Sequence, residues 1–325
     1  MQQRISQWTT AGALALASAL SLASAAHAAD TFPAHPLRLI VPFAAGSGPD
    51  VNARLMAHGL ETRIGQAVTV ENHAGANSLV GCNMVAKSAP DGYTLLYATN
   101  SGTSAARALF KEIPYDPTGD FAGVAMSHQS ALVLIVAPEH RGETLAQFVE
   151  KMRADPARYA IGGSSTTGEI LSALLKSAGK TEHTYVRYAN SANELNDVMG
   201  GRIGGSMSAI PGLAPLVAAG KIYPLAVTSA ERVAAFPNTP TMADTYPGLV
   251  LTSWSGYFVP AKSPRPAIAY LYQKMTEVFK DPAVDKSIQD AGSPYRMTPE
   301  EMDTFLKKDE QHWLQVVHMA GMSPQ

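Results

Sequence analysis

The sequence predicts an α/β fold with largely parallel sheets, and three observations carry this prediction. Apolar runs of strand length are almost uninterrupted, as expected for strands buried on both faces of a sheet. Several of these runs lead into a loop of small residues and then into apolar residues at helical spacing. The chain has 325 residues, of which 46% are hydrophobic and 16% charged, so it can bury large cores.

The first part of the chain is expected to contain three strand–loop–helix units. A strand over residues 37–43 leads through small residues to a helix. Pro49 suits the start of that helix, where its missing N–H costs nothing, and Gly65 suits the C-terminal cap. The other expected elements are strands over 68–71 and 93–97, a helix over 79–88, and polar loops over 75–78 and 99–104.

The pattern restarts in the middle of the chain. A strand over 131–136 is followed by a short strand at 159–161 and a polar loop over 162–169. Thr166 and Glu169 have the spacing of a capping box, which predicts the start of a helix over 170–177. Ser191 and Glu194 repeat that spacing before a helix over 195–199.

The last third is expected to return to the first part of the fold. Strands are predicted over 203–210 and 223–228, then a proline-rich connection over 236–247 and a returning strand over 249–259. Helices follow over 266–280 and 283–291. The terminal helix begins at Thr298, because Pro299 and Glu301 complete a capping box with proline in the first turn.

Composition excludes several functions. Lys and Arg total 25 against 27 Asp and Glu, so no basic excess exists to attract nucleic acid or an anionic membrane. Cys82 is the single cysteine, which rules out intrachain disulfides and cysteine-based metal clusters, and we expect it to be a buried thiol. No H-x-x-x-H pair, G-x-S-x-G elbow, Walker loop or S-x-x-K motif occurs. We therefore expect no enzymatic activity, metal or cofactor.

The N-terminus has the features of a signal peptide. Arg4 is the only charged residue before Asp30, and an Ala/Leu-rich stretch ends in Ala26-His27-Ala28, a pattern that signal peptidase cleaves. The alternative is a transmembrane anchor, but the apolar run is short for a span of about 20 residues. We predict cleavage near Ala28 and an exported, soluble mature protein.

The small polar residues gather at equivalent positions, after strands and before helices. The carboxyl ends of parallel strands line the ligand crevice of an open sheet. Backbone N–H groups at helix starts bind anions without Lys or Arg. One such loop is explained by turn formation alone, but four indicate a site for an anion or another polar ligand.

Segments along the whole mature chain resemble the Bug-type receptors, which are periplasmic substrate-binding proteins of tripartite tricarboxylate transporters. The resemblance is carried by PLRLIVPFAAGSGPD, KSAPDGYTLLYATNSGTSA, YAIGGSSTTGE, GGRIGGSMSAIP and SWSGYFVPAKSP. It implies a two-lobed periplasmic binding protein (type II), with a ligand cleft between two α/β domains joined by two crossing segments. After a signal peptide over 1–28, domain 1 is expected over 30–130 and 255–325, and domain 2 over 131–254.

The resemblance also implies where the ligand carboxylate binds. The family holds it with the loop after the first strand and the loop that opens the second domain's first helix. The implied ligand-binding residues are Phe43, Ala44, Ser47, Asp50, Asn77, Ser78, Asn100, Ser101, Thr103, Gly163, Ser164, Ser165, Thr166, Thr167, Ser208 and Ile210. Asp50 has an alternative role as a helix-dipole partner, and Asn77 and Asn100 as turn formers.

Two departures from the family pattern bear on the ligand. Residues 45–48 read Ala-Gly-Ser-Gly where PGGG is usual, which adds a hydroxyl. Residues 205–210 lack the aspartate that amino-acid-binding members offer to the ligand amine, and the cleft loops contain no Lys or Arg. We expect a dicarboxylate without an amine, either an aromatic one such as terephthalate or a small aliphatic acid with Phe43 and Ile210 as core residues.

The expected function is that of a periplasmic receptor that captures this small-molecule carboxylate by cleft closure. It would act as a monomer and deliver ligand to the membrane permease subunits of a tripartite tricarboxylate transporter. Two alternatives remain open: a ligand-sensing subunit for a signalling partner, and an exported α/β hydrolase with Ser164 or Ser165 as nucleophile. The hydrolase would need a histidine base within reach, and no histidine stands out.

Overall fold

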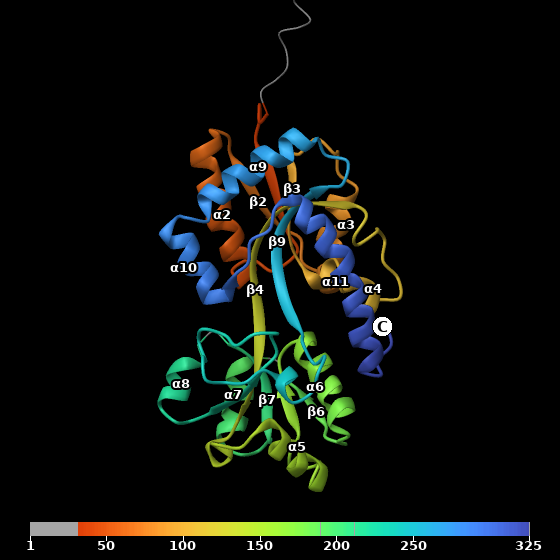
Figure 1. Cartoon of the computed structure of the whole chain (residues 1–325). Coiled ribbons are helices and arrows are strands. Elements are labelled where there is room, and N and C mark those ends of the chain that lie inside the picture. The colour runs from red at the N-terminus through yellow and green to blue at the C-terminus, as the bar shows by residue number, and fades with distance from the viewer. Residues whose placement is uncertain (1–31, 189, 211, 325) are drawn as a thin grey trace, which may run out of the picture.

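The computed structural model describes residues 32–188, 190–210 and 212–324, which form two α/β lobes joined by extended strands (Figure 1). The signal peptide predicted over 1–28 lies outside these residues. No helix in the described ranges is both long and apolar enough to cross a membrane.

Lobe 1 is built on parallel strands from the first part of the chain. β1 (Leu37–Val41) lies between β2 (Val68–Asn72) and β3 (Thr94–Thr99). β9 (Thr252–Pro260) runs antiparallel to β3, β4 (Phe121–Val136) runs antiparallel to β9, and β10 (Ser293–Pro294) pairs with β4. The early strands and the returning strand therefore share one sheet, as the sequence predicts.

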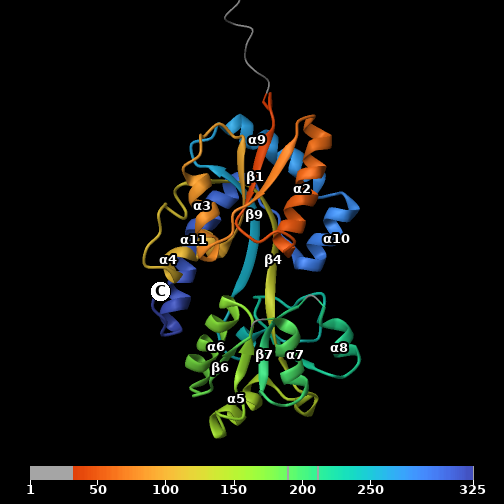
Figure 2. The same cartoon turned by 180° about the vertical axis from the view of Figure 1, so that it is seen from behind.

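Helices cover both faces of this sheet (Figures 1 and 2). Alternate side chains of β1 point to opposite faces, with Leu39 packing in one apolar cluster and Ile40 in another. The first face is covered by α2 (Gly48–Ile64), α9 (Arg265–Val278) and α10 (Pro282–Ala291). The second face is covered by α3 (Leu79–Ala86), α4 (Ala106–Leu109) and the first half of α11 (Pro299–Met319).

Lobe 2 repeats this architecture on a smaller sheet. β5 (Ile161–Gly163) is parallel to β6 (Tyr185–Arg187) and β7 (Gly205–Ala209), while β7 and β8 (Tyr223–Val227) both pair antiparallel with β4. The helices of this lobe are α5 (Leu145–Ala154) and α6 (Thr166–Gly179) on one face, and α7 (Ser191–Met199) and α8 (Ala214–Ala218) on the other.

Two strands cross between the lobes. β4 pairs with β9 from Phe121 to Ala131 and with β7 from Leu132 to Val136, so its partner changes within one continuous strand. We propose this change of partner as the domain boundary on β4. The predicted domain limits, 30–130 with 255–325 and 131–254, remain a prediction.

The terminal helix contacts both lobes. Met302 and Leu306 pack in lobe 1 beside Trp254. Trp313, Val316 and Val317 belong to a second apolar cluster, which contains residues of α5 and α6. The last turns of α11 lie against α6, so α11 is a third structural link between the lobes.

Several sequence predictions of local structure are confirmed. Pro49 lies in the first turn of α2, and Gly65 caps it in the left-handed conformation with φ of 68°. Thr298 and Glu301 form the predicted capping box of α11. Cys82 is fully buried, and burial raises the pKa of its thiol to about 12.

Other predictions are wrong in detail. α6 is capped by Ser165 instead of Thr166, and α7 by Asn190 instead of Ser191. β4 begins at Phe121, well before residue 131, and α5 and β6 are absent from the sequence prediction. The two cap errors have a common cause, because Glu169 and Glu194 bond to neighbouring strands instead of to the helix start.

Candidate ligand-binding cleft

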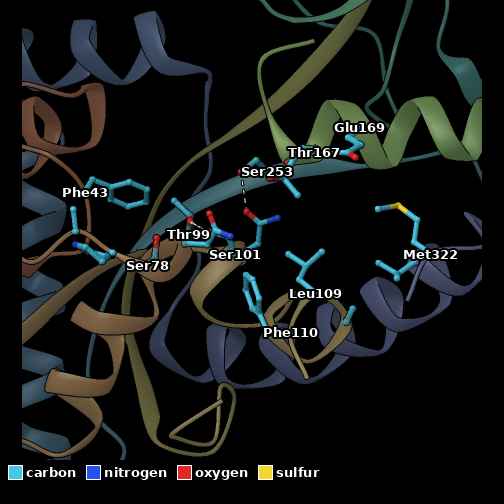
Figure 3. Close-up of a pocket in the computed structure, with 18 of the residues that line it drawn as sticks. Phe43, Ser78, Thr99, Ser101, Leu109, Phe110, Thr167, Glu169, Ser253 and Met322 are labelled. Carbon is cyan, nitrogen blue, oxygen red and sulfur yellow. Dashed lines mark hydrogen bonds between the residues drawn. The ribbon is translucent and has the colours of Figure 1, made fainter. Parts of the chain in front are cut away.

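A cavity of about 710 Å³ lies between the lobes (Figure 3). Its lobe 1 wall comes from the loop after β1, the loop after β2, and the turn after β3. Its lobe 2 wall comes from the start of α6 and the end of β6. The carboxyl ends of β1, β3 and β6 therefore converge on one space, and of these strands β6 is the one that the sequence did not predict.

Half of the predicted site residues line this cavity. They share a position immediately after a strand or at a helix start, and they are Phe43, Ala44, Asn77, Ser78, Asn100, Ser101, Thr166 and Thr167. Thr166 and Thr167 form the first turn of α6, where backbone N–H groups have no partner inside the helix and carry partial positive charge. These backbone N–H groups attract an anion, although Glu169 carries a negative charge in the same turn.

The other predicted residues do not line the cavity. Ser47 is the N-cap residue of α2, Asp50 lies in the first turn of α2, Gly163 ends β5 and Ser164 follows it. Ser165 accepts the Gly168 N–H as the cap of α6. Thr103 is fully buried and donates to the Thr99 carbonyl oxygen at 2.9 Å. Ile210 lines a separate cavity of about 560 Å³ beside Ser130 and Ala131 of β4. Their contact with ligand, like that of Ser208, remains a prediction.

Asp50 stabilises the loop after β1. Its Oδ2 accepts hydrogen bonds from the Gly46 N–H at 2.8 Å and from Arg54 Nε at 3.0 Å, and its Oδ1 accepts from Asn72 Nδ2 at 2.9 Å. Burial opposes its ionisation, but these bonds outweigh burial and lower the pKa of Asp50. Asn72 also donates to the Phe43 carbonyl oxygen. The carboxylate therefore fixes the backbone next to the cavity.

The loop after β2 has an unusual backbone. Ala76, Asn77 and Ser78 have φ of 43°, 51° and 80°, three consecutive non-glycine residues in the left-handed region. Such strain persists only where surrounding structure imposes it, and it concentrates at ligand clamps. Here the neighbouring turn packs closely, since a Cβ on Gly102 would lie 2.6 Å from Cys82 Sγ and 3.2 Å from Ser78 Cβ.

The loop after β5 is held by β6. Tyr185 donates from its hydroxyl to the Ser165 carbonyl oxygen at 3.2 Å. Glycine at position 163 leaves room for Tyr185, because a Cβ there would overlap the Tyr185 hydroxyl oxygen and displace it. The N-terminus of α6 is thereby fixed in front of the cavity.

A charged pair that the sequence argument missed lines the lobe 2 end of the cavity. Glu169 of α6 and Arg187 of β6 form an ion pair there, although the cleft was expected to lack Lys and Arg. Ser253 of β9 also lines the cavity and donates to Asn100 Oδ1 at 2.8 Å. Arg187 was missed because β6 has only three residues and no clear apolar pattern.

A second carboxylate whose position the sequence did not predict is buried beside β7. Glu194 of α7 is fully buried, and its Oε1 accepts hydrogen bonds from the hydroxyls of Ser206 and Ser208. Among the described residues, its Oε2 has no hydrogen-bond partner. β7, which lacks the aspartate of the amino-acid-binding members, therefore has the Glu194 carboxylate beside it. Glu194 does not line the cavity, so it offers no exposed counter-charge to an ammonium group.

The serine residues of the α6 loop are bonded to groups other than histidine. Ser164 Oγ lies 3.3 Å from Ser191 Oγ, and Ser165 Oγ accepts the Gly168 N–H at 3.1 Å. Across the part of the chain that the structure describes, neither hydroxyl has a hydrogen bond to an imidazole. The arrangement lacks the base that a serine nucleophile needs.

Comparison with known proteins gives a consistent result. A model of the tripartite tricarboxylate transporter family receptor matches residues 52–322. Protein BugT of Bordetella pertussis is 31% identical over 298 residues, covering 90% of this chain and 91% of its own length.

Solved structures with the same architecture include the periplasmic binding protein BugD. It is 25% identical with a TM-score of 0.71, over 90% of this chain and 100% of its own. A protein of R. palustris whose structure contains adipate is 28% identical, with a TM-score of 0.74 over 91% of this chain and 100% of its own.

Proposed function

Because this chain belongs to the tripartite tricarboxylate transporter receptor family, we propose that its cleft captures a dicarboxylate that lacks an amine. As a member of that family it is a two-lobed periplasmic solute-binding receptor and not an enzyme. We further propose that it is cleaved near Ala28, acts as a monomer, and delivers the ligand to the transporter's membrane permease.

The cavity between the lobes is the observation that carries this proposal. Its lobe 1 wall offers the side chains of Asn77, Ser78, Asn100 and Ser101, and its lobe 2 wall offers the first turn of α6. Neutral donors of this kind bind carboxylate oxygens directly or through water. A ligand held by both walls would draw the lobes together.

The absence of an amine follows from the charges around the cavity. Among the described lining residues the only carboxylate is Glu169, which already pairs with Arg187. Burying an unpaired ammonium group costs several kcal/mol in a partly desolvated site. Adipate, which the R. palustris relative holds, is likewise a dicarboxylate without an amine.

The middle of the cavity supports a ligand with an apolar body. Leu109 and Phe110 line it between the two ends, and Phe43 lies at the lobe 1 end (Figure 3). These side chains fit either a short aliphatic chain or an aromatic ring. An aromatic diacid such as terephthalate and an aliphatic diacid are therefore both candidates for the natural ligand.

A thermal-shift screen of carboxylic acids tests the proposal. A ligand at 100 times its dissociation constant adds about 2.7 kcal/mol of stability, which is easily measured. We expect glutarate to bind and glutamate, which differs by one ammonium group, to bind much more weakly. We also expect the best acid to lose most of its affinity as its methyl ester. Equal binding of acid and ester, or tight binding of glutamate alone, would contradict the proposal.

A further inference from the structure

The two ends of the cavity differ in charge. Phe43 and Ser78 lie at one end and Glu169 at the other, with Leu109 and Phe110 along the wall between them (Figure 3). The lobe 1 end carries neutral amides and hydroxyls. The lobe 2 end carries Arg187, which is the only cationic side chain among the described residues that line the cavity.

The Arg187 guanidinium can exchange its partner Glu169 for a ligand carboxylate. Its side chain is 56% exposed and that of Glu169 is 32% exposed, so solvent screens their attraction and the pair contributes little to stability. A guanidinium binds one carboxylate as readily as another, because its planar donors match any carboxylate in a bidentate geometry. A ligand carboxylate that enters this end of the cavity can therefore replace or share Glu169.

Glu169 also opposes an anion at this place. It lies in the first turn of α6, and its negative charge offsets the partial positive charge of the helix start. Without Arg187, the lobe 2 wall would present a carboxylate to an incoming carboxylate. With Arg187 beside it, the same wall accepts one further negative charge.

We propose that Arg187 determines specificity for dianionic ligands by binding the second carboxylate, and that Glu169 occupies the guanidinium while the cleft is empty. This inference rests on the proposed function, since it presupposes that a first carboxylate binds at the Asn77–Ser101 end. It favours diacids whose carboxylates are far enough apart to reach both ends of the cavity, and it disfavours monoacids of equal length.

The test compares matched diacids and monoacids by titration calorimetry. The panel pairs succinate with butyrate, adipate with hexanoate, suberate with octanoate, and terephthalate with benzoate. In the native protein, we expect the best diacid to bind at least tenfold more tightly than its monoacid. R187Q should abolish that preference by weakening the diacid at least tenfold while changing the monoacid less than twofold. E169Q should strengthen the diacid severalfold.

The control is R202Q. Arg202 pairs with Asp197 in the same lobe, is similarly exposed, and does not line the cavity. It should leave both affinities unchanged. If R187Q lowers the affinities for diacid and monoacid equally, or lowers neither affinity, Arg187 does not determine specificity. The protein would then still be a carboxylate receptor. If the native protein binds no acid of the panel, the proposed function fails together with this inference.

Discussion

At the scale of single residues, two buried histidines couple folding to pH. Burial, followed by the charge of Arg296, lowers the pKa of His128 to about 4 from an ordinary 6.5. Burial, followed by the charge of Lys176, lowers the pKa of His183 to about 4, while Glu182 weakly opposes this. His183 lies between the hydroxyls of Ser172 and Thr181, and its hydrogen bond with Ser172 raises its pKa but is outweighed by burial.

These histidines should destabilise the fold as the pH falls from 6.5 to 4. Between these pH values the two histidines are protonated more fully in the unfolded chain than in the folded chain. The free energy of unfolding therefore rises with pH. Each histidine contributes up to about 3 kcal/mol across the window. Urea titrations at pH 7.5, 6 and 5 measure how the free energy of unfolding changes with pH. H183Q should make this change smaller. H58Q, at a histidine whose side chain is 81% exposed, is the control variant.

Asp50 does not line the cavity, but its substitution should weaken ligand binding because Asp50 holds the loop after β1 in place. D50N removes the charge that holds the Gly46 N–H and Arg54, and charge-assisted hydrogen bonds of this kind are each worth roughly 1.5–3 kcal/mol. We expect a lower unfolding midpoint in urea and weaker binding of the best diacid. D290N, at an exposed helical pair with Lys286, should change neither. Unaltered stability of D50N would show that the loop holds without it.

At the scale of elements, the sequence predicts helix starts best where proline and capping residues indicate the same position. α2 and α11 have proline in the first turn, and α11 also has a complete capping box, so local chemistry determines where they begin. β6 could not be predicted because its three residues, two partly buried and one exposed, show no periodicity, and Arg187 was missed with it. The predicted caps of α6 and α7 are wrong by one residue because Glu169 and Glu194 bond to strands that are adjacent in space but separated in the sequence. Spacing along the chain does not reveal such bonds.

The β5–α6 turn offers a test of one such tertiary constraint. G163A should push Tyr185 away, because the new Cβ would overlap its hydroxyl oxygen, and should thereby shift Ser165 and the start of α6. We expect weaker ligand binding, measured by calorimetry. G163A/Y185F should restore much of it, because the double variant lacks the clashing oxygen. If Y185F alone weakens binding as much as G163A, and the effects add, the clash is not the cause.

At the scale of the whole molecule, the three links between the lobes determine how the cleft can move. β4 and β9 are continuous strands, and the pairing of β4 changes from β9 to β7 between Ala131 and Leu132. α11 packs in lobe 1 through Met302 and Leu306. It also contacts α6 of lobe 2, and Trp313 and Val317 share an apolar cluster with residues of α6 and of α4. A rotation of the lobes must therefore bend the two strands and pivot at the end of α11.

Ligand binding should draw the lobes together around these links. Because both walls of the cavity offer donors to one ligand, the liganded form gains contacts that a wider cleft would lose. We expect the radius of gyration in small-angle X-ray scattering to fall when the best diacid saturates the protein. The diamide of that acid is the matched control and should leave the curve unchanged. An identical curve with and without saturating diacid would contradict closure, and the ligand would then bind between lobes that do not move.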